Sequence, residues 1–474
     1  MPLPSLKRDK WLLGKLAALA LAGLTLSAQA DYKDDIGYTA LLNELGANTP
    51  NGAGVSVTHA EASSTSTNPT TYYYLPTTSA YTGVSFTNAS SSAYPGAISA
   101  VSGHADMVGQ HIYGDNSMGY GISAVTNYEA NHWINGGFLN SQSRFSAPRT
   151  ESNDVQNHSW VGSSASSQII LSRLDYAIER DDFVSVVGVN NEVNADRELL
   201  SAAYNVISVG ITNGNHSSTP TSAVQRPHIV APVGTTSEAT GIVTSAATLL
   251  IQQARTSYGA SSNAEKSETI KAIMLAGATK TEFQNWLRTD TMPLDSVYGA
   301  GELNVYNNYH IMAGGEQTAS ATPQAVVAAT GWDYGTVAAS QTVSYYFDLT
   351  ANSDVSIALT WNAKYTATLS DYNNLQLVLA NLNLYFYLVG ENNELTLVQQ
   401  SISGTENLEY IWATGLASGK YLIQVVSASG STDYALAWQT ADSLTTIPEP
   451  STIALVIIGA VFALFHFRRQ ARRA

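Results

Sequence analysis

The spacing of hydrophobic and polar positions changes along the chain, with a first clear change near residue 169. From there to about residue 275, short β-branched runs alternate with segments whose apolar residues recur at helical spacing. Helices are expected over residues 169–180, 198–203, 241–254 and 266–275, and strands over residues 183–189 and 204–209. This alternation predicts an α/β fold in which helices flank a parallel sheet.

The pattern differs on either side of this region. Residues 51–166 are rich in Ser, Thr, Asn, Gly and Tyr, which predicts long surface loops. Beyond a linker at residues 314–323, turn-separated apolar runs predict strands over residues 344–349, 355–361, 375–388, 395–399, 408–412, 421–426 and 434–438. A series of short strands at such intervals is typical of a β-sandwich.

Residues 1–30 have the pattern of a secretory signal peptide. An apolar run over residues 16–26 is followed by Ala28 and Ala30, small residues at the −3 and −1 positions of a cleavage site after Ala30. The run is shorter than the roughly 20 residues that span a bilayer. The basic residues that precede it are Lys7, Arg8, Lys10 and Lys15.

The C-terminal end has three parts in order: the tripeptide Pro448-Glu449-Pro450, an apolar helix over residues 453–465, and a tail with Arg468, Arg469, Arg472 and Arg473. Such a helix halts translocation, and the arginines hold the tail in the cytoplasm. A plain single-pass anchor is one interpretation. The order of parts resembles the PEP-CTERM sorting signal of Gram-negative envelope proteins. That resemblance implies export, membrane contact through the C-terminal helix, cleavage by an exosortase-type sorting enzyme, and a place in the cell envelope or outside the cell.

Composition narrows the function. Among 474 residues there is no cysteine, which excludes a thiol nucleophile, disulfides and cysteine-ligated metals. A net charge of −15 argues against nucleic acid as a partner, because phosphate contacts need clustered Lys and Arg. No metal cluster is visible, and no cofactor is expected. The expected parts are a signal peptide (1–30), an α/β domain (31–315), a β-sandwich (324–445) and a sorting signal with a transmembrane helix (447–474).

One serine stands where a nucleophile could act. Residues 226–243 (RPHIVAPVGTTSEATGIV) give a strand, a glycine-containing turn, and Ser237 at the start of an apolar helix. A helix N-terminus exposes such a serine and favours negative charge beside it. Taken alone, Ser237 is equally well explained as a helix N-cap.

Three earlier segments supply groups that a serine nucleophile needs. His104 lies in residues 102–109 (SGHADMVG), and Asn191 follows the strand that begins at Val184. Residues 51–61 (NGAGVSVTHAE) end in Glu61, a carboxylate that can hold a histidine tautomer and stabilise the imidazolium. His59 is expected on the same face of that strand, but a histidine has the wrong charge for this role.

These segments, in the order acid, His, Asn, Ser, resemble subtilisin-like serine peptidases over about residues 50–312, including the closing segment 298–304 (YGAGELN). The resemblance implies a subtilisin-like parallel sheet, Ser237 as nucleophile, His104 as general base, Glu61 as orienting acid and Asn191 as oxyanion donor. It also implies that residues 158–162 (HSWVG) form a substrate-binding strand for a polypeptide, through Ser159, Trp160 and Gly162.

Several positions depart from the family pattern. Glu61 replaces an aspartate and is one methylene longer, so the strand position must compensate. Residues 105–107 differ from the usual Gly-Thr-His, and Gly241 stands where the family has proline. The C-terminal strands, among them residues 345–349 (YYFDL) and 381–385 (NLNLY), resemble the bacterial pre-peptidase C-terminal domain, an accessory module of secreted peptidases.

The sequence therefore predicts an exported serine endopeptidase that hydrolyses peptide bonds through an acyl-enzyme. The main alternative is a catalytically inactive subtilisin-fold protein that binds a partner in the envelope, favoured by the altered residues around His104 and the glutamate at position 61. A second alternative is a sedolisin-type acid peptidase with a Ser-Glu-Asp triad. His104 and Asn191 argue against it, because that group uses aspartate at the oxyanion position.

Overall fold

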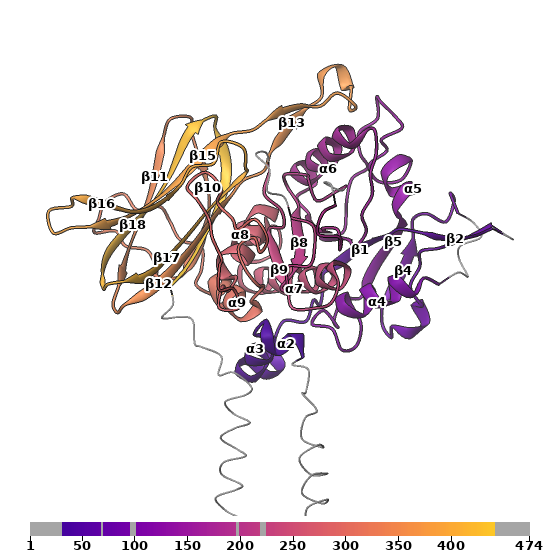
Figure 1. The fold of residues 1–474 in the computed structure, drawn as a ribbon, viewed down its shortest axis with the longest axis horizontal. Coiled ribbons are helices and arrows are strands. Elements are labelled where there is room, and N and C mark those ends of the chain that lie inside the picture. Colours follow the sequence, from indigo (N-terminus) through magenta and orange to yellow (C-terminus); the bar gives the residue numbers. More distant parts are fainter. Residues whose placement is uncertain (1–30, 68–69, 95–100, 196–198, 219–223, 441–474) are drawn as a thin grey trace, which may run out of the picture. The chain divides into compact units, whose positions relative to one another are not determined.

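A computed structural model describes residues 31–67, 70–94, 101–195, 199–218 and 224–440 (Figure 1). The chain divides into two units, Met1–Asp35 with Pro448–Ala474, and Ile36–Ile447. The described part of the first unit holds the short helix α2 (Tyr32–Asp35). The expected signal peptide and C-terminal transmembrane helix lie outside the described residues. Among the residues that are described, no helix is both long and apolar enough to cross a bilayer.

The centre of the second unit is a seven-stranded parallel sheet in the order β4-β5-β1-β6-β7-β8-β9. Its strands are β1 (Ser56–Glu61), β4 (Ser85–Asn88), β5 (Ala124–Glu129), β6 (Val155–His158), β7 (Val184–Gly188), β8 (Ile207–Ile211) and β9 (Ile229–Ala231). The strands from β6 to β9 are buried at every residue, as is usual for a parallel sheet covered by helices. The parallel sheet predicted from the alternating pattern is therefore present.

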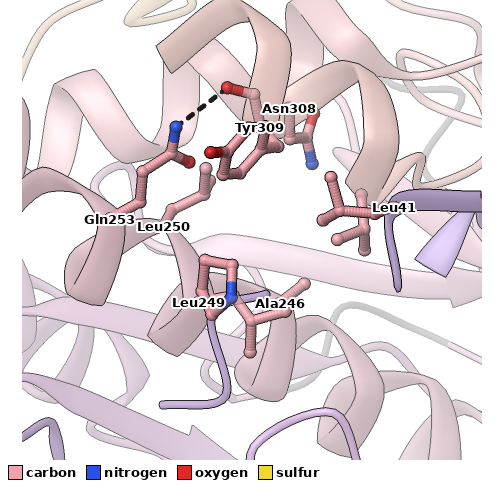
Figure 2. A pocket seen from close by; sticks show the side chains of 9 residues that line it. Leu41, Ala246, Leu249, Leu250, Gln253, Asn308 and Tyr309 are labelled. Atoms are coloured by element: carbon pink, nitrogen blue, oxygen red, sulfur yellow. Dashed lines mark hydrogen bonds between the residues drawn. The ribbon is translucent and has the colours of Figure 1, made fainter. Parts of the chain in front are cut away.

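Helices connect and cover these strands. They are α3 (Tyr38–Leu45), α4 (Gly103–Ile112), α5 (Ala130–Asn135), α6 (Ser167–Asp181), α7 (Thr236–Tyr258), α8 (Ser267–Gly277) and α9 (Val305–Ala313). The long helix α7 packs against β6, β7 and β8, and α4 packs against α7. Leu41 of α3, Leu249 of α7 and Tyr309 of α9 line a crevice of about 10 Å³, which has room for at most one water molecule (Figure 2).

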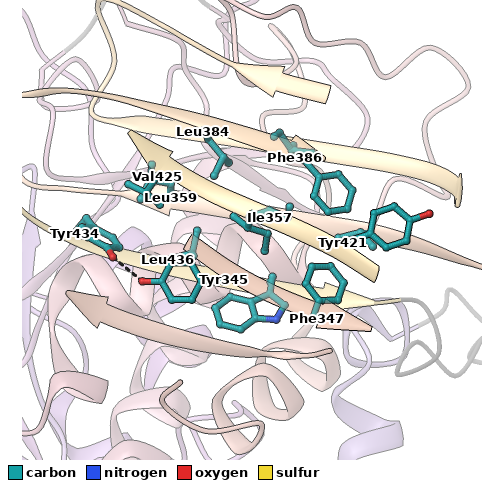
Figure 3. Close-up of a cluster of buried hydrophobic side chains, with 14 of the residues drawn as sticks. Tyr345, Phe347, Ile357, Leu359, Leu384, Phe386, Tyr421, Val425, Tyr434 and Leu436 are labelled. Atoms are coloured by element: carbon teal, nitrogen blue, oxygen red, sulfur yellow. Dashed lines mark hydrogen bonds between the residues drawn. The ribbon is translucent and has the colours of Figure 1, made fainter. Parts of the chain in front are cut away.

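The C-terminal region forms two antiparallel sheets of four strands each, in the orders β10-β19-β12-β17 and β11-β18-β15-β16. Their strands are β10 (Gly331–Val337), β11 (Thr342–Leu349), β12 (Ser353–Thr360), β15 (Asn381–Val389), β16 (Leu395–Ser401), β17 (Leu408–Leu416), β18 (Gly419–Ser429) and β19 (Thr432–Thr440). Alternate side chains from both sheets fill one hydrophobic core, with Phe347, Ile357 and Phe386 among them (Figure 3). Within this core the Tyr345 and Tyr434 hydroxyls lie 2.6 Å apart.

The single strand expected over residues 375–388 is wrong. The run is divided between β14 (Gln376–Val378), which pairs with β13 (Lys364–Thr366), and β15 of the sandwich. The division falls near Ala380, whose carbonyl accepts from the buried Trp361 indole at 2.9 Å. The loop between β13 and β14 reaches the α/β region, where Asp371 pairs with Arg144 at 2.6 Å.

Two other local expectations need correction. The helix expected over residues 198–203 does not form in its described part, because the carbonyls of Ser201 and Ala203 accept from the buried Arg226 guanidinium. Residues 51–166 were expected to have long surface loops, and between their loops they carry more regular structure than composition indicates: β1, β4, β5, β6, α4 and α5. Polar residues are buried in these strands and bonded there, as when Asn157 donates to Thr244 at 2.9 Å, so apolar periodicity does not reveal them.

The α/β region and the sandwich share a buried junction. All residues of α8 are buried, since β12 and β19 of the sandwich pack against this helix. Asn205 and Ala363 exchange hydrogen bonds across the junction at 2.8 and 2.9 Å, and Arg226 pairs with Glu406 at 3.5 Å. The linker expected from the sequence at residues 314–323 thus joins two regions that fold against each other.

Candidate active site

Glu61, His104 and Ser237 form a continuous chain of polar contacts. His104 Nδ1 lies 2.9 Å from Glu61 Oε1, and His104 Nε2 lies 3.1 Å from Ser237 Oγ. The residues are separated by long stretches of sequence and come from β1, α4 and α7. Each ring nitrogen of His104 therefore has one partner, which is the arrangement that a serine nucleophile with a histidine base requires.

The fold brings these residues to one edge of the sheet. Glu61 is the last residue of β1, and Ser237 is the second residue of α7, which follows the end of β9. The carboxyl ends of parallel strands form the usual ligand-binding edge of an α/β sheet. His104 reaches this edge from the first turn of α4, whose N-cap Ser102 accepts from the Ala105 N–H at 3.2 Å.

Capping interactions fix the helix turn that holds Ser237. Thr235 is the N-cap of α7 and accepts from the Glu238 N–H at 3.3 Å, while its hydroxyl donates to Glu238 Oε2 at 2.8 Å. The N-cap of α7 is thus Thr235 and not Ser237, which the local sequence also allowed as the cap. This leaves the Ser237 hydroxyl facing His104 and the carbonyl of Ser159, which it contacts at 3.2 Å.

Asp106 and Gly241, which differ from the residues of subtilisin-like peptidases that this sequence resembles, both make close contacts around α4. Asp106 accepts from the Thr77 N–H at 2.5 Å and from its hydroxyl at 2.7 Å, which ties α4 to the loop before it. Gly241 lies where α7 crosses α4: a Cβ atom there would stand 3.2 Å from the Val108 carbonyl oxygen. Asp106 and Gly241 therefore both help to fix the position of α4, the helix that carries His104.

The second carboxylate oxygen of Glu61 faces His59, the histidine two residues earlier on the same strand. His59 Nε2 lies 3.5 Å from Glu61 Oε2, and His59 Nδ1 lies 2.9 Å from the Tyr113 hydroxyl. His59, Glu61 and Tyr113 are all buried. The carboxylate is thus held between two histidines. The alternation of β1 already placed His59 on the same face as Glu61, whereas no sequence signal indicated Tyr113.

The two histidines decide the charge of Glu61. Burial acts to raise the pKa of Glu61, but hydrogen bonds and charge from His104 and His59 together outweigh it and lower this pKa. The hydrogen bond that His104 donates to Glu61 raises the pKa of His104 above its usual value, against the opposing effect of burial. The site therefore favours an ionised carboxylate beside a histidine that readily takes up a proton.

Asn191 follows β7 and lies against Thr236, the residue before Ser237. Its Oδ1 accepts from the backbone N–H of Thr236 at 2.9 Å and contacts the Thr236 hydroxyl at 3.2 Å. Because a backbone N–H can only donate, the acceptor must be the carbonyl end of the Asn191 amide. The Nδ2 group takes no part in these two contacts with Thr236.

The three expected substrate-binding residues have different surroundings. Ser159 lies beside Ser237, and its hydroxyl donates to the Ser237 carbonyl at 3.1 Å. The Trp160 side chain is buried against Trp133, so it does not form an open groove wall. The Gly162 carbonyl accepts from the Leu199 N–H at 2.8 Å, and this part of the segment is already paired within the chain.

In the part of the chain that the structure describes, no group of three or more His, Asp or Glu residues is placed to hold a metal ion. No family model matches the chain, and no curated protein matches it.

Solved structures match part of the chain. The structure of the prenylagaramide maturation protease PagA is 15% identical, with a TM-score of 0.39 over 57% of this chain and 98% of that one. The structure of the patellamide maturation protease PatA is 13% identical, with a TM-score of 0.35 over 55% of this chain and 98% of that one. The self-cleaved protease domain of PatA is 13% identical, with a TM-score of 0.36 over 57% of this chain and 100% of that one.

Proposed function

We propose that this chain is an exported serine endopeptidase of the subtilisin-like kind. The observation that carries the proposal is the unbroken series from Glu61 through His104 to Ser237, with contacts of 2.9 and 3.1 Å. Its substrate is a polypeptide, and its reaction is hydrolysis of a peptide bond through an acyl-enzyme.

The four residues divide the steps of this reaction among them. His104 Nε2 takes the Ser237 proton as Oγ bonds to the peptide carbonyl carbon, and Glu61 stabilises the resulting imidazolium. The Asn191 amide and the Ser237 N–H hold the negative oxygen of the tetrahedral intermediate. His104 then gives its proton to the leaving amine. Water, deprotonated by the same histidine, hydrolyses the ester and restores Ser237.

Export and sorting belong to the same proposal and rest on the sequence. The signal-peptide pattern of residues 1–30 supports passage across the inner membrane. The tripeptide at residues 448–450, the apolar helix and the arginine tail support transient membrane anchoring and cleavage by an exosortase-type enzyme. The final place is the cell envelope or the exterior.

Labelling with a fluorophosphonate probe tests the nucleophile. The wild-type protein is expected to be labelled and Ser237→Ala is not, with loss of peptide hydrolysis on the order of a millionfold. Ser245→Ala is the matched control, because Ser245 is a buried serine of the same helix and should leave labelling intact. Labelling of Ser237→Ala would rule out this nucleophile. A folded wild type that neither reacts with the probe nor cleaves casein would favour the inactive binding protein.

A further inference from the structure

The outer face of the sheet β11-β18-β15-β16 carries aromatic side chains. The other sheet of the sandwich packs on α8 through β12 and β19, so this sheet is the one turned away from the α/β region (Figure 1). Phe347 and Phe386 point into the sandwich core. Because side chains alternate along a strand, Tyr346, Tyr385 and Tyr387 point outward. All three tyrosines are half-buried, and they lie outside the core that the two sheets share.

Two of these tyrosines belong to one row that crosses the sheet. Tyr346 of β11 pairs with Leu422 of β18, which in turn pairs with Tyr387 of β15. On its other side Tyr387 pairs with Leu397 of β16, which is 48% exposed. Leu422 is buried between the two tyrosines. Neighbouring strands lie about 4.8 Å apart, so the backbones that carry Tyr346 and Tyr387 are roughly 10 Å apart. The row is therefore an apolar strip with tyrosines at a fixed spacing.

A more polar row runs beside this strip. Gln424 of β18 is in register with Ser344 of β11 and with Tyr385 of β15. Tyr385 pairs on its other side with Gln400 of β16. The rings of Tyr385 and Tyr387, one in each row, have centroids 6.2 Å apart and planes that differ by 21°. Amide groups, which offer both donors and acceptors, thus lie next to aromatic rings.

The four strands carry little charge. Their charged residues are Asp348 and Lys420, which pair with each other at 2.8 Å. Such a surface has no excess charge to attract a charged polymer. Aromatic rings favour contact with apolar groups, while amides beside them bond hydroxyls. A neutral sugar offers both, because C–H groups cover the faces of its ring and hydroxyls project from its edge.

We propose that this face binds an extended, neutral β-1,4-linked glucan. Such a chain is a flat ribbon in which every second sugar ring presents the same side. The repeat of the ribbon is one disaccharide, and its length matches the spacing between Tyr346 and Tyr387. The chain lies across the strands, with sugar rings on the two tyrosines and hydroxyls on the Gln424 and Gln400 amides. The site goes beyond the proposed peptidase activity and does not depend on it, because it uses none of the residues around Ser237.

Calorimetric titration of the full chain with cellohexaose tests the ligand class. Cellohexaose is expected to bind saturably at millimolar concentration or below. Maltohexaose has the same sugar units in a curved chain that cannot lie flat on both tyrosines, so it is expected to bind about tenfold more weakly. Equal binding of the two oligosaccharides, or no saturable binding of cellohexaose, would overturn the proposal.

Variants of the row locate the binding. Tyr346→Ala and Tyr387→Ala each remove one ring and are expected to weaken cellohexaose binding about tenfold, with melting curves verifying the fold. Tyr387→Thr keeps a strand-forming residue and repeats the test if alanine lowers the melting temperature. Tyr120→Ala is the matched control, because Tyr120 is a 49% exposed tyrosine outside the sandwich. Unchanged affinity in both Tyr346→Ala and Tyr387→Ala would contradict the proposed site.

A polypeptide is the competing occupant of this face. Casein binding that Tyr387→Ala abolishes, together with cellohexaose binding that it leaves unchanged, would assign the face to a protein instead. Ser237→Ala is expected to bind cellohexaose as tightly as the wild type does. This comparison keeps the test of the glucan site separate from the test of the proposed peptidase.

Discussion

Gly241 of α7 lies directly against the carbonyl oxygen of Val108 in α4. A Cβ atom added at Gly241 would be 3.2 Å from that oxygen and 2.9 Å from the Cβ of His111. The two helices meet here almost backbone to backbone. Since α4 carries His104 and α7 carries Ser237, this contact sets how closely the base approaches the nucleophile.

Gly241→Ala should therefore lower activity without unfolding the protein. The added methyl group pushes α4 outward by a few tenths of an ångström, which lengthens the contact between His104 and Ser237. We expect kcat to fall by about tenfold or more, since small displacements of reacting groups carry large rate penalties. Gly404→Ala is the control, because an added Cβ at Gly404 meets nothing within 4 Å. Unchanged kcat in Gly241→Ala would show that the crossing is not critical.

Replacing Glu61 by aspartate is expected to reduce the proposed activity. In Glu61→Asp the carboxylate retracts by one methylene and cannot keep both its contact of 2.9 Å to His104 and its contact of 3.5 Å to His59. A displacement near 1 Å costs about a hundredfold in rate, so kcat/KM should fall by roughly that factor. Steady-state kinetics on a peptide substrate measures this. An aspartate variant as active as wild type would mean that strand β1 adjusts freely.

The pH dependence should follow the pKa of His104. His104 must be neutral to accept the Ser237 proton, and Glu61 raises its pKa, so activity should fall on the acid side at a pH above the usual histidine value. In Glu61→Gln the raising charge is gone, and the acid limb should move to lower pH while kcat falls by about 10⁴-fold. Profiles of kcat/KM against pH report both effects. An acid limb that does not move would separate Glu61 from the titration of His104, and maximal wild-type activity near pH 4 would favour the acid-peptidase alternative.

His59 should act by holding Glu61, and its loss should appear in acid stability as well as in rate. His59→Leu leaves the Glu61 Oε2 atom and the Tyr113 hydroxyl without their histidine partner, which costs about 1–3 kcal/mol. The pKa of Glu61 is lower in the folded protein than in the unfolded chain, so ionised Glu61 stabilises the fold at any pH above its unfolded-state pKa. This stabilisation is lost as the pH falls through the folded-state pKa. With His59 removed, the pKa of Glu61 rises, so acid unfolding should begin at higher pH.

Circular dichroism across an acid titration measures the effect of His59→Leu. Thr256→Ala, an exposed position of α7, serves as a control for handling and expression. Identical acid midpoints for His59→Leu and the wild type would contradict a holding role for His59.

Removal of the sandwich should unfold the α/β region. A protein ending at residue 320 exposes α8, whose residues are all buried in the whole chain, and leaves Arg226 without Glu406. Breaking a buried ion pair alone costs about 3–5 kcal/mol, a large part of the stability of an ordinary domain. We expect the truncated chain to be insoluble or to lack a cooperative melting transition. A soluble truncated chain that melts like the full chain would show that the two regions fold independently.

The order of four short segments along the sequence was enough to nominate Glu61, His104, Asn191 and Ser237, which the structure brings together. This works because strand ends and helix starts carry local signals. Strand alternation places His59 and Glu61 on the same face of β1 and so could have predicted their contact. The charge of a histidine excludes it as the orienting acid, but not as a partner of that acid. Tyr113 and the row through Tyr346 and Tyr387 depend on contacts between distant segments, for which the chain offers no local pattern.

The close packing between the α/β region and the sandwich was harder to predict for the same reason. The amino-acid composition changes at residues 314–323, and such a change usually marks a linker between independently folded domains. The junction is instead formed by α8, which packs on β12 and β19, and by single polar residues such as Asn205 and Glu406, which are not distinguishable in sequence from surface residues.

The burial of α8 also sets an order of events during synthesis. The chain is made from its N-terminus, and β19 (Thr432–Thr440), which covers α8, is the last strand of the sandwich to be made. Ser237 and His104 are therefore synthesised long before β19, the strand that covers α8. Helix α8 in turn packs against α7, which carries Ser237. A nascent chain therefore contains Glu61, His104 and Ser237 but lacks the finished cover of α8 until residue 440 has been added.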